Sequence, residues 1–330
     1  MTTPNLSEFS NLVLCLYRAA GEQPLNAFQD EALSIIKRML PFDRSMWGTA
    51  TNTPAGIDIH SIHLHNEPQE MLEFYEEVKH QDSAAAACAD RPRATLSFHS
   101  SAFFAGRGAS GMRALCERFE HANMLISSEI DPATQFVQWI SLYRSDRDAI
   151  CGERDRRLLE LLAPHVMQSL SLNRLSHLDT LRANPRFARF AFAVADVRGV
   201  IYHADQTFEE LLRVEFGNPH RGRLPDRLVA HFADKRADRR PFLGNEIVVR
   251  ASLPEQGLLF VNARPRLQID RLTEREREIA RLLAQGATHK QVARALNRSP
   301  ATVRNRTQVI YEKLGIHAVA ELAAHVQADD

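Results

Sequence analysis

Six cationic side chains gather in one short stretch of this 330-residue sequence, with a single acid, Glu312, among them. The stretch runs from Gly286 to Ile316, and its net charge of +5 is concentrated enough to attract phosphate groups. Arginine can hold guanine through two hydrogen bonds, and asparagine or glutamine can hold adenine in the same way. The residue types and the local charge therefore indicate recognition of nucleic acid. The cations are Lys290, Arg294, Arg298, Arg304, Arg306 and Lys313.

Local signals predict the helices that would carry these cations. A capping box begins at Thr273, so a first helix is expected there, and Gly286 ends it. Thr288 can cap a short second helix. The pair Ser299-Pro300 is an N-cap hydroxyl followed by proline at the first helical position, which predicts a third helix that ends at Gly315. Two short helices joined by a tight turn, the second of them basic, follow the helix-turn-helix plan, and a fourth helix comes after them.

Five motifs in this segment match a known pattern. They are Leu272-Thr273-x-Arg275-Glu276, Leu283-Ala284-Gln285-Gly286, Lys290-x-Val292-Ala293, Ser299-x-x-Thr302-Val303-Arg304-Asn305 and Ile310-Tyr311-x-Lys313-Leu314-Gly315. Together they resemble the LuxR-type helix-turn-helix domain, a four-helix domain usually found at the C-terminus of bacterial transcription regulators. Arg306 and Gln291 stand where histidine and glutamate are common in that family, a difference that would shift sequence preference and leave the fold intact.

The resemblance implies that the third helix enters the major groove of double-stranded DNA. Its exposed face would then carry Arg304, Asn305 and Gln308 toward the bases. Any one of these residues could instead be an ordinary solvated position on a surface helix. The full predicted DNA-binding set, which adds phosphate contacts and a motif position, is Thr288, Lys290, Thr302, Val303, Arg304, Asn305, Arg306, Gln308 and Lys313.

Length and composition limit what the rest of the chain can be. A chain of 330 residues predicts two or three domains, and 44% hydrophobic with 25% charged residues is typical of a soluble globular protein. The 41 cations balance the 41 acids, so affinity for DNA must come from a local patch. No apolar run is long enough to span a membrane, and the apolar residues 11–20 lack the features of a signal peptide. Four scattered cysteines suit reduced thiols, and the expected location is the cytoplasm.

The N-terminal part predicts an α+β sensor domain over residues 1–152. Helices are expected over 7–40, 71–79 and 112–121, and strands over 45–50, 57–64, 123–130 and 135–145, the last two forming a hairpin. The run from Trp139 to Arg144, followed by Leu158 to His165, resembles the end of GAF-like domains that precede LuxR-type tails. Such a domain can enclose a small ligand against its sheet. Side chains that could line the pocket, or simply fill the core, are Trp47, Phe74, Tyr75 and Trp139.

Two further regions complete a multidomain α+β fold with an all-α four-helix end. Residues 153–184 predict a long helix whose apolar stripe could be a dimer seam or could pack on its own domain. Residues 185–265 open with a strand, the turn Asp196-x-x-Gly199 and a second strand, which resembles a PAS-like domain. Residues 266–330 are then the helix-turn-helix domain.

Two stretches of the chain come near a catalytic or metal-binding pattern. Gly106-Arg-Gly108-Ala-Ser-Gly111 has the spacing of a dinucleotide fingerprint, but no buried strand is predicted before it, and the strands after it read as a hairpin. His63 and His65 share one face of a strand that also holds His60, yet the sequence shows no third metal ligand near them. We therefore expect no catalytic residues, no metal and no cofactor, and a protein that is not an enzyme. An enzyme with a DNA-binding tail is the alternative from another class.

The favoured function is a DNA-binding transcription regulator, working as a homodimer because one small helix-turn-helix reads too few base pairs. Its N-terminal domains would respond to a small-molecule effector or a partner. Double-stranded DNA is the main expected partner, and RNA polymerase is a further candidate. The alternatives are a quorum-sensing regulator that binds an acyl-homoserine lactone, faintly suggested by residues 75–82, and a phosphorelay response regulator. The acidic cluster and phospho-accepting aspartate that the second alternative requires are not found in the sequence.

Overall fold

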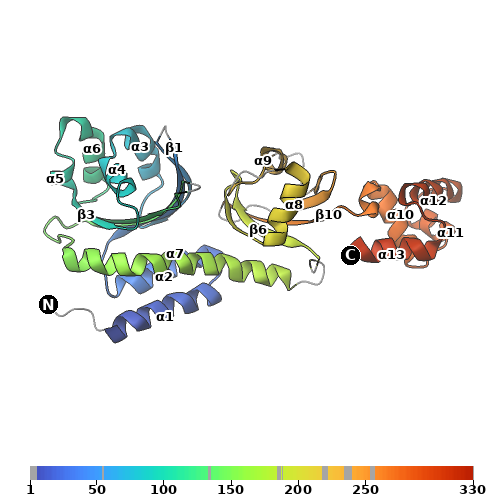
Figure 1. The fold of residues 1–330 in the computed structure, drawn as a ribbon, viewed down its shortest axis with the longest axis horizontal. Coiled ribbons are helices and arrows are strands. Elements are labelled where there is room, and N and C mark those ends of the chain that lie inside the picture. Colours follow the sequence, from blue (N-terminus) through green and yellow to red (C-terminus); the bar gives the residue numbers. More distant parts are fainter. Residues whose placement is uncertain are drawn as a thin grey trace.

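The computed structural model describes residues 6–53, 56–132, 135–183, 187, 189–217, 222–233, 240–252 and 257–329. Three bodies lie in a row in Figure 1: an N-terminal α+β domain, a second α+β domain and a C-terminal group of helices. A single long helix, α7 (Glu153–Arg182), runs under the first body and reaches the second. In this described part of the chain, no helix has the length and apolar character needed to cross a membrane.

The first domain is built on an antiparallel five-stranded sheet in the order β2-β1-β5-β4-β3. Its strands are β1 (Arg44–Thr53), β2 (Gly56–His65), β3 (Thr95–His99), β4 (Asn123–Ile130) and β5 (Phe136–Arg144). Its helices are α1 (Leu6–Glu22), α2 (Leu25–Lys37), α3 (Glu70–Val78), α4 (Ser83–Ala89), α5 (Ser100–Phe103) and α6 (Ser110–Arg118). Short 3-10 turns occur at Lys79–Gln81 and Arg107–Ala109.

Helices cover both faces of this sheet. Helices α3 to α6 lie over one face, while α1, α2 and α7 lie under the other (Figure 1). Because side chains alternate along a strand, each strand serves both layers. In β5, Ile140 and Leu142 join the core with α1, α2 and α7, and Tyr143 joins the core with α3, α4 and α6. The sheet therefore separates two apolar cores within one domain.

Helix α7 connects the domains through its apolar stripe. Leu158, Leu162, Val166 and Leu170 are buried against the first domain, and Leu178 is buried against the second sheet. The stripe is thus used within its own chain, as in the alternative that the sequence left open. A dimer seam on α7 would have to use other side chains, and that role stays a prediction.

The second domain repeats the strand order of the first. Its sheet runs β7-β6-β10-β9-β8, again antiparallel. The turn at Asp196 has the expected form, because its carboxylate accepts the backbone N–H groups of Arg198 and Val200 at 3.0 and 2.8 Å, and Gly199 has a φ of 87°. The elements are β6 (Ala191–Asp196), β7 (Ile201–Ala204), α8 (Gln206–Phe216), α9 (Asp226–Ala233), β8 (Phe242–Leu243), β9 (Ile247–Ala251) and β10 (Leu258–Pro265).

The C-terminal domain has the four helices that the sequence predicted, and a 3-10 turn precedes them. These elements are η4 (Gln268–Arg271), α10 (Glu274–Ala284), α11 (His289–Ala295), α12 (Pro300–Leu314) and α13 (Val319–Asp329). Capping boxes begin α10 and α11, Ser299 caps α12, and Gly315 ends it in the left-handed conformation at φ 65°. The apolar core of this domain comes from residues 267–326. The helical spacing of Val319, Leu322, Ala323 and Val326 predicts that all four face inward. Leu322 and Val326 are buried and Ala323 is half-buried, but Val319 is 44% exposed.

Several short elements of the first domain escaped the sequence prediction, among them α4, β3 and α5. Residues 84–89 look featureless, yet they form α4, because Asp82 accepts the backbone N–H groups of Ala84 and Ala85 and so begins the helix. Strand β3 was not predicted at all, although Thr95 and Phe98 are buried in it. It pairs antiparallel with β4, so the glycines at 106–111 do not follow the parallel strand that a dinucleotide fingerprint requires.

Candidate nucleic-acid interface and candidate ligand cavity

Helix α12 presents a polar face outward and an apolar face inward. Its buried residues are Val303, Thr307, Ile310 and Leu314. Pro300 supplies the preset φ of the first turn, and Ser299 Oγ accepts the Thr302 backbone N–H at 3.1 Å. The start of the helix is therefore fixed, and so is the direction of its outward face. Exposed on α12 are the predicted residues Thr302, Arg304, Asn305, Arg306 and Gln308.

Helix α11 adds two more exposed members of the predicted set, Thr288 and Lys290. The Thr288 side chain caps α11 by accepting the backbone N–H of Gln291, whose own side chain accepts the Thr288 backbone N–H at 2.8 Å. Glutamine can complete this capping box as glutamate would, so its departure from the family residue leaves the helix start intact. Only the charge at the start of α11 differs.

Two predicted residues have other contacts. The Val303 side chain is 1% exposed and packs in the domain core, so it cannot reach a base. Lys313 Nζ lies 2.7 and 2.9 Å from the carboxylate oxygens of Glu276, which is 3% exposed. Burial opposes ionisation of Glu276, but hydrogen bonds from Lys313 and Thr273 hold its pKa below the usual range. Lys313 thus ties α12 to α10, and its predicted phosphate contact would compete with this ion pair.

A buried ion cluster joins the second domain to the helices. Asp270, 3% exposed, lies 2.6 and 2.9 Å from the guanidinium of Arg264 at the end of β10 and 2.9 Å from Arg277 on α10. Burial raises the pKa of Asp270, but the hydrogen bonds and charges around it, chiefly those of Arg264, lower it by more. Its pKa therefore lies below the ordinary value. The cluster fixes the entry of the chain into the C-terminal domain.

The first domain holds a cavity of about 100 Å³ between its sheet and α3, α4 and α6. Most of its lining is apolar, with polar groups at a few points, as in small-molecule sites. Of the four aromatic residues predicted to line a pocket, Tyr75 and Trp139 do so. Trp47 is buried in the core on the other face of the sheet, and Phe74 stacks edge-on against Phe119.

Asp82 is the main polar group of the cavity. One carboxylate oxygen caps α4, and the other accepts the Tyr75 hydroxyl at 2.9 Å. Burial raises the pKa of the Asp82 carboxyl above its ordinary value, against the hydrogen bonds that lower it. Burial likewise raises the pKa of the Tyr75 hydroxyl. Asp82 entered the sequence prediction only as the end of residues 75–82 and not as a helix cap, although an aspartate just before Ser-Ala-Ala-Ala is the signal of a helix N-cap.

A hydroxyl and two thiols lie elsewhere in the lining. Ser128 Oγ is buried with no hydrogen-bond partner among the described residues, so it is available to a bound molecule. Burial raises the pKa of the Cys88 and Cys116 thiols to about 12, so both stay protonated at neutral pH. The cavity thus suits a mainly apolar molecule with one or two hydrogen-bonding groups.

A second polar cluster lies on the opposite face of the sheet, where both domains meet α7. Thr49 Oγ1 and Tyr202 Oη are 2.9 Å apart, and the Arg174 guanidinium lies 4.2 Å from the centre of the Tyr202 ring. His60 is close to Asp196, at 3.9 Å, but neither ring nitrogen has a hydrogen-bond partner among the described residues. Burial lowers the pKa of His60, against the pull of Asp196. The cluster connects β1, β2, α7 and the second sheet.

Comparisons with known proteins agree with the C-terminal geometry. Residues 270–326 match the GerE family, described as bacterial regulatory proteins of the luxR family, so the helices of this region are a LuxR-family helix-turn-helix domain. No curated protein matches the sequence.

Solved structures of LuxR-type proteins give weak overall matches. CepR2 of Burkholderia cenocepacia, described as an N-acylhomoserine-lactone-dependent LuxR-family transcription factor, is 16% identical over 50% of this chain and 92% of its own, with a TM-score of 0.38. Escherichia coli SdiA is 14% identical over 98% and 97%, with a TM-score of 0.35. The VqsR ligand-binding domain of Pseudomonas aeruginosa is 14% identical over 52% and 96%, with a TM-score of 0.36. Scores this low transfer no ligand to the present chain.

Proposed function

We propose that this chain, whose residues 270–326 are a LuxR-family helix-turn-helix domain, is a transcription regulator whose DNA binding is controlled by a small molecule in the first domain. The observation that carries the proposal is the outward face of α12. There, beyond a capped and proline-started first turn, Arg304, Asn305 and Gln308 stand exposed together. These three side-chain types read guanine and adenine edges in the major groove.

Phosphate contacts would come from the rest of the exposed set. Thr288 and Lys290 on α11, and Thr302 and Arg306 on α12, flank the base-reading residues. Such contacts fix the position of the protein on the duplex without reading its sequence. Arg306 also lies 4.0 Å from Glu276, and this long ion pair leaves the 59% exposed guanidinium able to turn to a phosphate.

The ligand would be a mostly apolar molecule that donates a hydrogen bond. Asp82 can accept from an N–H or O–H group, Ser128 can pair with a second polar group, and Trp139 offers a flat apolar wall. The cavity, at about 100 Å³, is smaller than the roughly 300–1,000 Å³ of typical ligand sites. A larger ligand would enter by displacing α4, whose alanines contribute little packing to hold it in place.

The two α+β domains, GAF-like and PAS-like in this proposal, would pass the signal along α7. Support comes from the Thr49–Tyr202 contact and the Arg174 side chain, which link the sheet behind the cavity to α7 and the second domain. The Asp270 cluster then continues into the DNA-binding domain. A homodimer remains part of the proposal, because two half-sites supply the specificity that one domain lacks.

The structure bears differently on the phosphorelay regulator and on the lactone receptor. A phosphorelay receiver is built on a parallel sheet in which helices alternate with strands. Both sheets here are antiparallel. An acyl-homoserine-lactone receptor is a narrower form of our proposal, favoured by the pairing of Asp82 with Tyr75 beside Trp139, because a carboxylate can accept the N–H of an acyl amide.

The test combines DNA selection with ligand titration. Full-length protein and the 266–330 fragment, which contains its own core, would each select fragments from genomic DNA. We expect both to enrich the same inverted repeat, and the Arg304→Ala variant to lose roughly 1–3 kcal/mol of specific affinity because one base contact is gone. Unchanged binding by that variant would place the reading face elsewhere.

Acyl-homoserine lactones of increasing chain length would serve as ligand probes. Binding that disappears in the Asp82→Ala variant would support this ligand class. If none of the probes binds while the operator is still recognised, the lactone form of the proposal fails and the DNA-binding part stands.

A further inference from the structure

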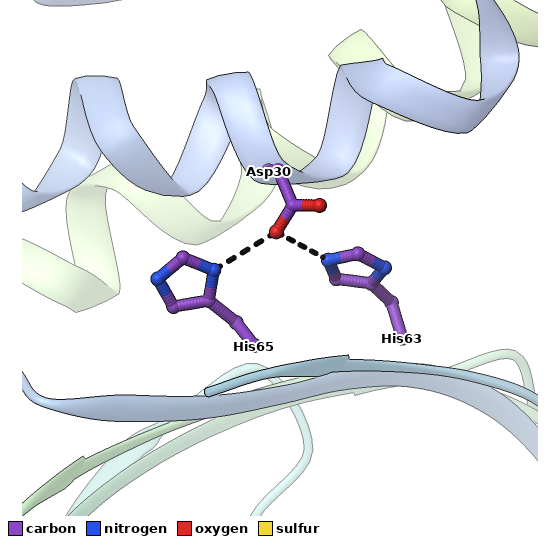
Figure 2. Close-up of side chains that lie close together, drawn as sticks. All are labelled: Asp30, His63 and His65. Atoms are coloured by element: carbon purple, nitrogen blue, oxygen red, sulfur yellow. Dashed lines mark hydrogen bonds and ion pairs between the residues drawn. The ribbon is translucent and has the colours of Figure 1, made fainter. Parts of the chain in front are cut away.

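We infer that Asp30, His63 and His65 form a binding site for a divalent transition-metal ion such as Zn²⁺. The two histidines project from β2, and Asp30 projects toward them from α2 (Figure 2). The sequence shows the two histidines but no third ligand, so we expected no metal site there. The fold supplies a third candidate ligand, because it brings in a carboxylate from more than thirty residues away.

The three ligand atoms already converge. One oxygen of Asp30 lies 3.0 Å from His63 Nε2 and 2.9 Å from His65 Nδ1, and the ligand atoms are all within 4.8 Å of one another. A tetrahedral zinc ion at about 2.0–2.1 Å from each ligand needs the ligand atoms to be roughly 3.3 Å apart. The two histidine–aspartate pairs would therefore open by a few tenths of an ångström, and the two ring nitrogens, which lie within 4.8 Å of each other, would adjust to the same spacing.

The choice of ligands selects the class of metal. Two imidazoles and one carboxylate suit Zn²⁺, Cu²⁺, Ni²⁺ or Fe²⁺, whereas Mg²⁺ and Ca²⁺ prefer oxygen ligands alone. Without a metal, each ring donates an N–H to the same carboxylate oxygen. With a metal bound, each neutral ring would carry its N–H on its other nitrogen, so that the two facing nitrogens and the aspartate oxygen are free to act as ligands.

Rigid elements hold the site and leave one side open. His63 and His65 are two residues apart, so they share one face of β2, and their side chains are only 19% and 17% exposed. An edge contact with Phe42 orients the His65 ring. Asp30 is 56% exposed, which provides an entry path and room for a water as fourth ligand.

The site is separate from the proposed ligand cavity but shares a strand with it. Ile62, next to His63 in β2, lines the cavity on the opposite face. A bound ion would clamp α2 to β2 and so would hold one wall of the cavity in place. It would also stabilise the folded protein, because metal binding favours the state that contains the site.

Calorimetric titration of chelator-treated full-length protein with Zn²⁺ is the test. We expect one ion per chain, with affinity at least tenfold lower in His63→Ala, in His65→Ala and in Asp30→Asn. Asp30→Asn is the informative variant, since its amide oxygen can still accept both ring N–H groups while the charged ligand is lost. His80→Ala, which changes an exposed histidine on another element, is the matched control and should bind like the parent.

Cobalt substitution gives a second readout that does not depend on stability. Co²⁺ in a four-coordinate site with nitrogen and oxygen ligands should give an intense visible absorption that is missing in each ligand variant. Thermal unfolding without metal shows whether each variant is folded. The inference is overturned if the parent shows no saturable binding, or if the three ligand variants bind Zn²⁺ as tightly as the parent and the His80→Ala control.

Discussion

The two sheets share one strand order but differ in what covers them. Over the first sheet, the short helix α4 brings mainly alanines to the core, and a cavity of about 100 Å³ remains beneath it. Over the second sheet, α8 and α9 bring Phe208, Leu212 and Leu228, all buried. Helices α3 and α6 add larger side chains such as Met71 and Leu115 over the first sheet, so the space beneath the alanine-rich α4 is a local feature of that layer. The strand order that the two sheets share therefore does not by itself determine where a cavity forms.

The largest expected effect is a loss of stability when the core of the second domain is disturbed. Phe208 is 0% exposed in the second core, so Phe208→Ala should lower the free energy of unfolding by about 3–5 kcal/mol, through lost burial and an unfilled hole. Urea denaturation followed by far-ultraviolet circular dichroism would measure this loss, since both tryptophans, Trp47 and Trp139, lie in the first domain. A loss under about 1 kcal/mol would mean that the second core already contains spare space, and the contrast between the sheets would fail.

An intermediate effect concerns Asp82 and pH. Because burial raises the pKa of this acid in the folded state, the protonated form is favoured there. Asp82 therefore adds stability below its unfolded pKa, and this contribution is lost as pH rises from about 3.8 through the folded pKa. Stability of the parent relative to Asp82→Asn should fall over that interval, as measured by urea denaturation at a series of pH values.

Asp270 should give stability the opposite dependence on pH. The arginines around it lower its folded pKa, so its contribution is present above about 3.8 and is lost as pH falls through the folded pKa. Asp270→Asn should therefore remove stability at neutral pH and have little effect in strong acid. Equal pH profiles for the two variants would contradict the assignment of Asp82 to a cavity and Asp270 to an ion cluster.

The smallest expected effect refines the nature of the cavity. Ser128 Oγ is buried without a hydrogen-bond partner among the described residues, so Ser128→Ala should change the free energy of unfolding of the empty protein by only about 1 kcal/mol, and in the stabilising direction. Ligand affinity should fall at the same time. Ser141→Ala, which alters another buried serine of the lining, is a useful control. Clear destabilisation by Ser128→Ala would show that its hydroxyl has a structural partner.

The sequence predicted the DNA-binding domain almost in full, because its signals are local. Caps at Thr273, Thr288 and Ser299 and the stop at Gly315 each depend on a few neighbouring residues, and each is found where it was expected. The failure there is Val319, whose exposure depends on how the last helix packs.

The polar lining of the cavity and the proposed metal site could not be predicted in this way. Asp82 and Ser128 come to line one cavity only when α4 packs over β4, and Asp30 reaches His63 only when α2 packs near β2. Such contacts join residues far apart in the sequence, where neither periodicity nor capping gives a signal. Tyr75 and Trp139 were predicted because large aromatic side chains are recognisable alone, and the same reasoning misplaced Trp47 and Phe74.

The C-terminal end of helix α7 extends beyond the first domain and contacts the second sheet. The helix has 30 residues, so it is about 45 Å long. Pro164 lies within it and lacks the N–H that would bond to the carbonyl of Glu160, but Val166 and Leu170 hold the turns that follow against the first domain. From Leu170 to Arg182 the helix extends about 18 Å, and a bend of roughly 10° would displace its far end by about 3 Å. A small change of angle where α7 leaves the first domain would therefore shift its contacts with the second sheet.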